Sequence, residues 1–306
     1  MKRYLSLALV LAATSAVIVA AQTKQPATGD DAIVRADRTL VAAFEKGDKA
    51  TIGKLLDADF SWIDTDGIMW AREDALRAGL KPLVPSGSDV KITEFKYGSK
   101  VVWIQNNQGN KFAAHFWVLR PAGWRLLHTN EIAVRPSEPG ANVRPNFAVP
   151  CINPCKEVPY KPISPSEMAA LAAWQDQESG TGNHDIHMGD NLIAVNSYSD
   201  GAARAAAQAE AEAAGKIKPN MPPNPTNANR PPVGAAPALY VRTWDFGDAI
   251  VAIMLQPTYG GKAYWSSRVF ANHNGFWKMD QSYHTTIQAA PRMTALPMKE
   301  QSSNAH

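Results

Sequence analysis

The sequence predicts an α+β protein made of two similar halves, in each of which helices precede a curved antiparallel sheet. One observation is a repeated phrase: "FKYGSKVVWI" at 95–104 and "WDFGDAIVAI" at 244–253 align Gly98 with Gly247 and Val102 with Val251. A second is that the same order of elements surrounds both copies. The third is that the strand after each glycine is apolar on both faces, unlike a strand in a sheet with one wet face.

In the first half, apolar residues at helical spacing from Ile33 to Phe44 predict a helix that ends at Gly47. Asp48 can cap a short second helix, "FSWID" is a strand, and "AREDALRAGL" is a third helix. Four strands follow at 90–97, 100–105, 112–120 and 124–133. Their turns are the two-residue loop Gly98-Ser99, "NNQGN" and "PAG".

The second half repeats this order. "SPSEMAALAAWQ" begins a helix with a capping box, in which Ser164 is the cap and Glu167 its partner. A strand at 191–198 and an alanine-rich helix at 202–214 follow, and then strands at 238–246, 249–256, 263–271 and 276–289. Gly247-Asp248 is expected to match Gly98-Ser99, and Asn274-Gly275 indicates a tight hairpin.

The doubly apolar strands determine how the halves associate. Val101 and Trp103 point one way and Val102 and Ile104 the other, so helices cover one face and the second face needs another layer. Each buried Val, Leu or Ile contributes roughly 1.5–3 kcal/mol, and a few of them rival the roughly 5–15 kcal/mol of a whole domain. We therefore expect the two sheets to pack face to face as a pseudo-dimer within one chain. The alternative is that each half dimerises with another molecule.

The termini and connectors set the predicted boundaries. Residues 1–21 have a basic start, an apolar run and small residues before Gln22, as in a secretory signal peptide. The halves are expected at 30–135 and 163–290, with a proline-rich linker at 136–162 and a disordered tail at 291–306. In an exported protein, Cys151 and Cys155 are expected to form a disulfide. We expect a periplasmic or secreted protein without a stable membrane span after processing.

The net charge excludes one class of partner. The chain carries a formal charge of +3, and removal of the leader with Lys2 and Arg3 leaves +1. A nearly neutral chain lacks the basic footprint of a nucleic-acid-binding protein.

The motifs "YGSKVVWI", "FWVLRPAGWRLLHTNEI", "FGDAIVAI" and "SSRVFANHNGFWKMDQSYHTTI" resemble the nuclear transport factor 2-like superfamily. The likeness covers about 31–134 and 164–289 and is nearest to SnoaL-like and ketosteroid-isomerase-like bacterial domains. It implies two cone-shaped domains whose chemistry, where present, lies between the concave sheet and the helices. Members include enzymes, ligand binders and association modules, so this fold alone names no reaction.

Strand alternation suggests candidate residues for such a cone. His115 alternates with Ala113 and Trp117, and His128 shares a predicted face with Trp124 and Leu126. Either imidazole can serve as a base or as a hydrogen-bonded core histidine. Asp59 is a third catalytic candidate, or simply a residue that begins a strand. The predicted ligand-binding side chains are Trp62, Trp70, Trp103 and Trp117.

No cofactor is expected, and no metal site is assigned, because His184 and His187 make only half of a usual ligand set. The second half places Gln281 where the first has His128, so a pocket that uses His128 is not duplicated. The sequence favours a monomeric exported protein that binds a small apolar or aromatic molecule. The alternatives are a cofactor-independent acid/base enzyme (an isomerase, cyclase or hydratase) and a non-catalytic association module.

Overall fold

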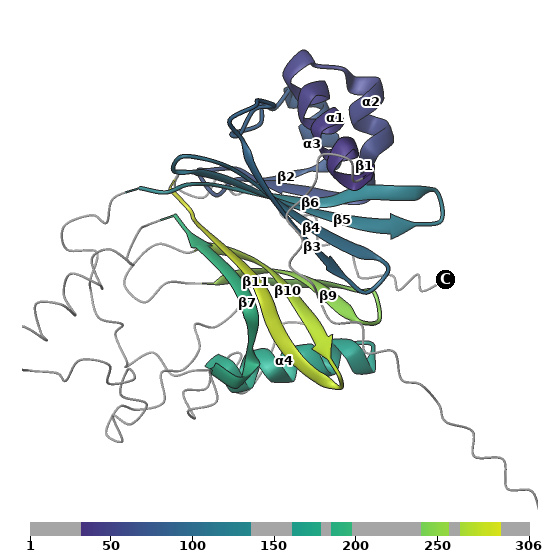
Figure 1. The fold of residues 1–306 in the computed structure, drawn as a ribbon, viewed down its shortest axis with the longest axis vertical. Coiled ribbons are helices and arrows are strands. Elements are labelled where there is room, and N and C mark those ends of the chain that lie inside the picture. The colour runs from purple at the N-terminus through teal and green to yellow at the C-terminus, as the bar shows by residue number, and fades with distance from the viewer. Residues whose placement is uncertain (1–31, 136–160, 179–184, 198–239, 257–263, 289–306) are drawn as a thin grey trace, which may run out of the picture.

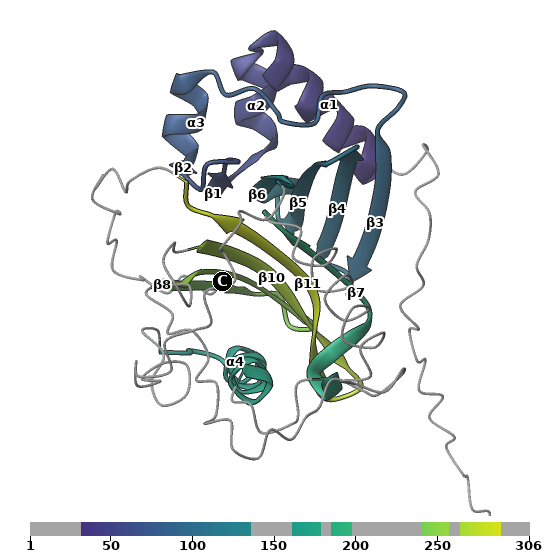
Figure 2. The ribbon, with the colours of Figure 1, turned by 90° about the vertical axis from the view of Figure 1, so that its left-hand side faces the viewer.

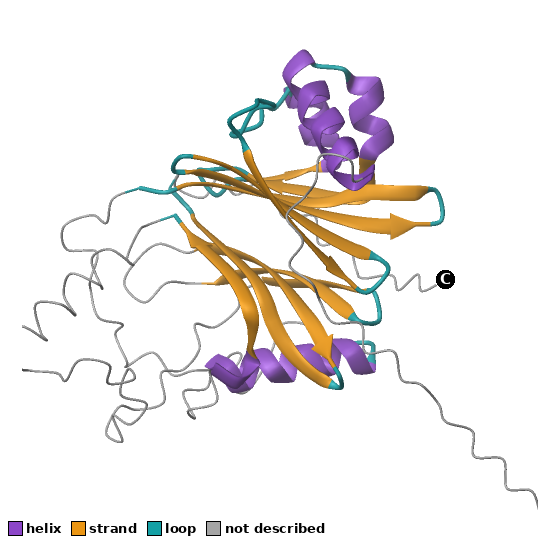
Figure 3. Cartoon of the chain, viewed as in Figure 1, coloured by secondary structure: helices purple, strands orange, loops and turns teal. Residues whose placement is uncertain are grey.

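The computed structural model describes residues 32–135, 161–178, 185–197, 240–256 and 264–288. These residues form four layers in the order helices, sheet, sheet, helix (Figure 1). The helices lie on the two outer sides and the strands in the middle (Figure 3). We call the helix-covered face of each sheet its outer face, and the face toward the other sheet its inner face. The predicted α+β class and the predicted packing of sheet on sheet are both confirmed.

Three helices precede or interrupt the first sheet. Helix α1 (Ala32–Lys46) buries one apolar stripe, and α2 (Lys49–Leu55) is capped by the Asp48 side chain, which accepts from Thr51 N at 3.1 Å. Helix α3 (Arg72–Ala78) ends at Gly79, whose φ of 63° is the left-handed conformation that glycine adopts most readily. The strands are β1 (Leu56–Ile63), β2 (Met69–Ala71), β3 (Lys91–Tyr97), β4 (Val101–Gln108), β5 (Lys111–Arg120) and β6 (Gly123–Ala133).

The second sheet is covered by a single described α-helix, α4 (Pro165–Glu178), followed by the short 3₁₀ helix η1 (Asp185–His187). Viewed from the side, α1, α2 and α3 lie over one sheet and α4 lies beyond the other (Figure 2). The predicted cap is present, since Glu167 N donates to Ser164 Oγ at 3.0 Å. The strands are β7 (Met188–Asn196), β8 (Tyr240–Asp245), β9 (Ala249–Gln256), β10 (Tyr264–His273) and β11 (Phe276–Thr286).

The two sheets have the same strand order. Sheet 1 runs β2-β1-β6-β5-β4-β3 and sheet 2 runs β7-β11-β10-β9-β8, so β1 corresponds to β7 and β3–β6 to β8–β11. The predicted antiparallel sheet needs one correction, because β1 pairs with β6 and β7 pairs with β11 in parallel. A parallel pair cannot be joined by a tight hairpin. Each first strand therefore sits beside the last strand of its half.

The glycine turns differ by one residue, which corrects the alignment of the two repeated phrases. In the first half Tyr97 pairs with Val101, which leaves a three-residue loop. In the second half Phe246 N donates to Ala249 O at 2.9 Å, which leaves two residues. A slip of one residue reverses the faces of a strand. Val251 therefore corresponds to Trp103, and the predicted match of Val251 with Val102 is wrong.

The inner faces form one continuous apolar core. Val101, Trp103 and Phe116 of sheet 1 pack in the same cluster as Val251 and Val269 of sheet 2, and all five are fully buried. Trp103 meets the Tyr283 ring at a centroid distance of 5.7 Å. On the outer faces, Val102 and Ile104 pack under the first helices, and Ile250, Ala252 and Met254 pack with α4 residues. Both faces of β4 and β9 are thus covered, as their sequences require.

Hydrogen bonds fix the register between the halves at one end of the sheets. Trp265 Nε1 donates to Gly67 O at 3.0 Å, and Gln288 N donates to Asp66 O at 2.9 Å. A Cβ at Gly67 would lie 2.8 Å from Ile287 Cα, and the Gly67 φ of +75° already disfavours a side chain. The turn after β1 can therefore approach the second half only with glycine at this position.

Several predictions fall outside the described residues. These are the signal peptide at 1–21, residues 136–160 of the predicted linker with Cys151 and Cys155, the helix at 202–214 and the tail at 291–306. Among the described helices, none combines the length and the apolar character that crossing a membrane requires.

Phe116→Ala is expected to lower the free energy of unfolding by about 3–5 kcal/mol, because the ring is fully buried between the sheets. Leu119→Ala on the same strand is the control, since Leu119 is 38% exposed and little packing is lost. Urea denaturation followed by tryptophan fluorescence measures both variants. Equal stability of the two variants would contradict the face-to-face core.

Candidate functional site

A polar cluster lies on the outer face of sheet 1, within an otherwise apolar layer under α1. His115 Nδ1 on β5 lies 2.6 Å from Asp37 Oδ1 on α1. Asp37 also accepts from Trp117 Nε1 at 2.8 Å and, through Oδ2, from Asn106 Nδ2 at 2.8 Å. Asp37 is 1% exposed and His115 is 5% exposed. The arrangement is a buried acid–imidazole pair held by two further donors.

Local sequence explains why these side chains meet. Asp37 lies among the buried residues of α1, near Val34 and Leu40. On β5, alternation puts Ala113, His115 and Trp117 on the same face, and Ile104 pairs with His115. The outer-face position predicted for His115 is therefore confirmed. Asp37 was missed, although an acidic residue inside an apolar helical stripe is a signal that the sequence already contains.

Opposing effects set the charges of this pair. Burial alone would raise the pKa of Asp37, but the charge of His115 and hydrogen bonds from His115, Asn106 and Trp117 leave that pKa lowered. Burial alone would lower the pKa of His115, but the charge and hydrogen bond of Asp37 leave it raised. Both shifts favour an imidazolium beside a carboxylate, and the 2.6 Å contact fits an Nδ1–H that donates to Asp37. Nε2 makes no hydrogen bond with any of the described residues.

A second carboxyl group completes the outer-face cluster. Glu131 on β6 pairs across the sheet with Ala113, which itself pairs with Asn106 on β4. Glu131 Oε1 accepts from Leu83 N at 2.7 Å. Burial raises the pKa of Glu131 to about 7, against the smaller lowering effects of Leu83, Trp62 and His115. Glu131 was also missed as a candidate, because a bulge in β6 decides on which face of the sheet it lies and the sequence pattern does not reveal this bulge.

Asn106 adds an unsatisfied acceptor to the cluster. Its side chain is 4% exposed, and Oδ1 has no hydrogen-bond partner among the described residues. A buried polar atom without a partner costs about 1–3 kcal/mol. Asn106, His115 and Glu131 thus surround Ala113, the smallest side chain in this part of the outer face. The site presents a donor at His115, an acceptor at Asn106 and a titratable carboxyl at Glu131.

The four predicted ligand-binding tryptophans do not share one face. Trp62 and Trp117 are buried on the outer face, and Trp70 packs half-buried at its margin and donates from Nε1 to Asp64 at 2.8 Å. Trp103 is fully buried on the inner face, against the other half. Only the first three are on the side of the polar cluster.

His128 lies on the inner face, so its predicted grouping with Trp124 and Leu126 is wrong. The pairing shifts between Phe116 and Trp117, which inserts one residue into β6 and reverses the side of His128. Its Nε2 lies 2.8 Å from Ser267 Oγ of the second half, and its Nδ1 lies 2.9 Å from Ser61 Oγ. Burial lowers the pKa of His128 to about 3. It is a neutral contact between the sheets.

Gln281 corresponds to His128, as the sequence predicted, but on the opposite face from the one expected. The pairing of β10 with β11 shifts at the equivalent place, between Val269 and Phe270. Gln281 Nε2 donates to Tyr97 OH at 2.7 Å across the sheet interface. The same bulge in both halves thus turns one polar side chain toward the partner sheet.

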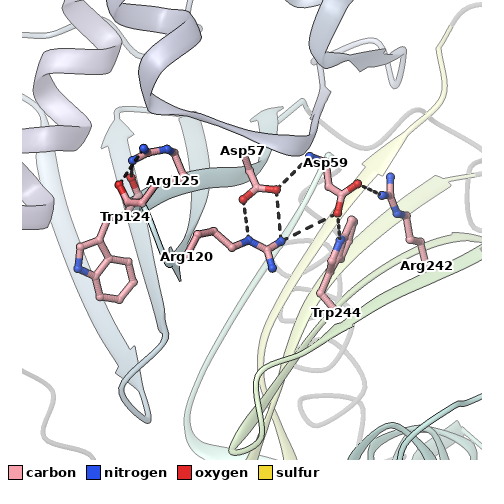
Figure 4. A network of polar contacts seen from close by, with 8 residues as sticks. Asp57, Asp59, Arg120, Trp124, Arg125, Arg242 and Trp244 are labelled. Atoms are coloured by element: carbon pink, nitrogen blue, oxygen red, sulfur yellow. Dashed lines mark hydrogen bonds and ion pairs between the residues drawn. The ribbon is translucent and has the colours of Figure 1, made fainter. Parts of the chain in front are cut away.

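Asp59 lies at the junction of the two halves and not in the cone (Figure 4). Its Oδ1 accepts from Arg242 Nη2 at 2.8 Å and its Oδ2 from Trp244 Nε1 at 3.3 Å, both on β8. Next to it, Arg120 Nε donates to Asp57 Oδ2 at 2.8 Å. Asp59 lies within β1 beside β8, the edge strand of sheet 2, and its side chain is 47% exposed. It forms an ion pair between the halves, and its catalytic role stays a prediction.

The second half does not repeat the cluster. Arg268 occupies the position of His115, and its guanidinium carbon lies 5.6 Å from the centre of the Trp174 ring. His284 occupies the position of Glu131, and burial lowers its pKa to about 3. His184 lies outside the described residues, and His187 Nε2 lies 2.8 Å from Asp176 Oδ2. Within the described parts of the chain, no three metal-ligating side chains gather.

The native protein is expected to lose stability as the pH rises from about 4.5 to 7, and Glu131→Gln is expected to abolish this loss. Over this range the unfolded chain gives up the Glu131 proton while the native chain keeps it, so the native protein becomes less stable as pH rises. The difference between native protein and variant is at most about 3.4 kcal/mol, at 1.36 kcal/mol per pKa unit. His115, Asp37 and Asp64 are unchanged in both proteins. Parallel pH profiles of urea midpoints would contradict a buried protonated Glu131.

No protein-family model matches the chain, and no curated protein matches it. Solved structures match about a third of it. An NTF2-like protein from Cytophaga hutchinsonii is 16% identical over 35% of this chain and 100% of its own, with a TM-score of 0.27. The association domain of C. elegans CaMKII is 16% identical over 32% of this chain and 91% of its own, with a TM-score of 0.25.

An NTF2-like protein of unknown function in nutrient uptake from Rhodospirillum rubrum is 20% identical over 34% of this chain and 100% of its own, with a TM-score of 0.23. These matches are similar to one stretch of this chain and do not extend to a pair of such units. The repetition rests on the two strand orders described above. Two of these three structures are described as NTF2-like, which is the class that the sequence motifs resemble.

Proposed function

We propose that the protein binds a small, largely apolar molecule in the first half, between sheet 1 and its helices, through the polar cluster around His115. The observation that supports this most is the buried Asp37–His115 pair, with its 2.6 Å contact and an imidazole Nε2 that no described residue engages. The surrounding Trp62 and Trp117 rings supply apolar surface. A few polar groups converging in an apolar setting are typical of small-molecule sites.

Stability alone does not account for this cluster. Replacing a buried ion pair by apolar residues of similar volume is often neutral or stabilising. The cluster also includes Asn106 Oδ1, which has no partner among the described residues, and Glu131, a buried carboxyl. A ligand that hydrogen-bonds to these groups would offset their cost. Departures from good core packing are expected at functional sites more than elsewhere.

A second candidate function is acid/base catalysis at the same site. It is favoured by two groups whose surroundings raise their pKa values, Glu131 to about 7 and His115 above its ordinary value. A carboxyl that titrates near neutral pH beside an imidazolium can donate and accept protons during a reaction. An isomerase, cyclase or hydratase without a cofactor would need no more than these groups. Turnover of a bound compound that Glu131→Gln abolishes would distinguish catalysis from binding.

We also propose that the exported protein is a monomer, since the inner faces of its two sheets already cover one another. Light scattering on protein recovered from a periplasmic or culture fraction is expected to give the mass of one chain without residues 1–21. Twice that mass would favour the association module, in which a further surface joins copies. A retained leader would contradict export by a cleaved signal peptide.

His115→Gln is expected to weaken binding of small neutral aromatic compounds by at least about tenfold, which is the usual effect of losing a hydrogen bond to a charged group. Quenching or shift of tryptophan fluorescence during titration with acetophenone and benzamide measures this, because Trp117 and His115 both contact Asp37. Asp59→Asn is the matched control, because Asp59 lies at the junction of the halves. Equal loss in both variants, or none in His115→Gln, would contradict the proposed site.

A further inference from the structure

The three polar groups around Ala113 differ in what they offer to a ligand. His115 uses Nδ1 to donate to Asp37, so the imidazolium offers Nε2–H as a donor. Asn106 uses its Nδ2 to donate to Asp37, so its buried Oδ1 offers an acceptor. Glu131 receives the Leu83 N–H on Oε1 and adds a carboxyl group on the far side of Ala113. A complementary ligand therefore carries both an acceptor and a donor.

Strand geometry brings these groups within the span of one small polar head. Asn106, Ala113 and Glu131 are direct cross-strand partners on β4, β5 and β6. Neighbouring strands lie about 4.8 Å apart, so the outer two Cα atoms are separated by about 10 Å. His115 follows Ala113 by two residues on the same face. Ala113, which carries only a methyl group, lies between the positions of Asn106 and Glu131 on the neighbouring strands.

The charges in this cluster disfavour an anionic ligand. The imidazolium of His115 is already neutralised by Asp37 at 2.6 Å. Glu131 adds negative charge when it ionises, and the carbonyl oxygen of Asn106 repels another oxygen that has no proton. Glu94, which faces the same side of sheet 1 opposite Ile104, already has Lys96 at 3.2 Å. None of these four described groups supplies an uncompensated positive charge for a carboxylate.

We propose that this site selects neutral ligands whose polar head is an amide, with a carbonyl oxygen and an N–H donor on one carbon, and rejects the carboxylates of the same shape. The carbonyl accepts from His115 Nε2–H, and the N–H donates to Asn106 Oδ1. The inference rests on the proposed binding function and names the chemical class of its ligand. It assigns specificity to Asn106 and Glu131, neither of which is positioned to hold the apolar part of the ligand.

Benzamide and benzoate test this selectivity, since they share one shape and differ in the donor and in charge. Calorimetric titration of the mature protein at pH 7 is expected to show benzamide binding at least tenfold more tightly than benzoate. At pH 8, above the pKa of about 7 of native Glu131, the ratio of the benzoate to the benzamide dissociation constant is expected to be at least threefold smaller in Glu131→Gln than in the native protein, because one negative charge is removed. Benzoate binding as tightly as benzamide to the native protein would overturn the selectivity while leaving the binding function intact.

Ala113→Leu tests the location, because it places a larger side chain between the positions of Asn106 and Glu131. It is expected to weaken benzamide binding at least tenfold, and Ala122→Leu, in an exposed turn of the same half, is the matched control. Circular dichroism establishes that both variants are folded. If Ala113→Leu does not fold, the titrations of the native protein and of Glu131→Gln still test the selectivity for benzamide over benzoate. Absence of binding by benzamide, acetophenone and benzoate alike would contradict the proposed function itself, and this inference with it.

Discussion

The apolar contact between the inner faces of the two sheets is the constraint on which the rest of the structure depends. Strands β4 and β9 are apolar on both sides, so neither sheet is stable in water with only its helices. Packing one sheet on the other buries the second apolar face of β4 and of β9 together, and this contact defines which face of each sheet is the inner one. Polar residues that reach the inner face are consequently confined to contacts such as His128 with Ser267. The outer faces pack against the helices of their own half, so their polar residues can differ between the two halves.

That division explains why the two halves have different chemistry on the same scaffold. Equivalent outer-face positions hold His115 and Glu131 in the first half and Arg268 and His284 in the second. Strand order, bulges and strand pairing are nevertheless shared. The scaffold therefore sets where side chains point, and the identity of a few residues sets which chemical groups each half presents on its outer face.

Much of the fold could be predicted from the sequence, because hydrophobic periodicity and turn residues act locally. The order of the described elements, the sheet-to-sheet packing and the outward position of His115 are confirmed, while the helix predicted at 202–214 lies outside the described residues. The errors in strand alignment and in strand face have one physical origin, a single extra residue. A three-residue loop at Gly98 and a bulge before His128 each reverse the faces of the strand residues that come after them, and alternation counted along the sequence cannot detect them. The sequence signals Asp37 as an acidic residue within an apolar helical stripe, but its contact with Asn106 depends on tertiary packing that the sequence does not reveal.

The bulge shared by β6 and β11 has a consequence for how such a protein can change. In a symmetric homodimer every substitution appears twice, so a residue at the two-fold interface must be compatible with its own copy. Here the corresponding positions are His128 and Gln281, and each meets a different neighbour, Ser267 in one case and Tyr97 in the other. Because the two halves belong to one polypeptide, a residue at this contact does not have to be compatible with a copy of itself. A substitution in one half can therefore change the chemistry of that half while the facing residues of the other half stay the same.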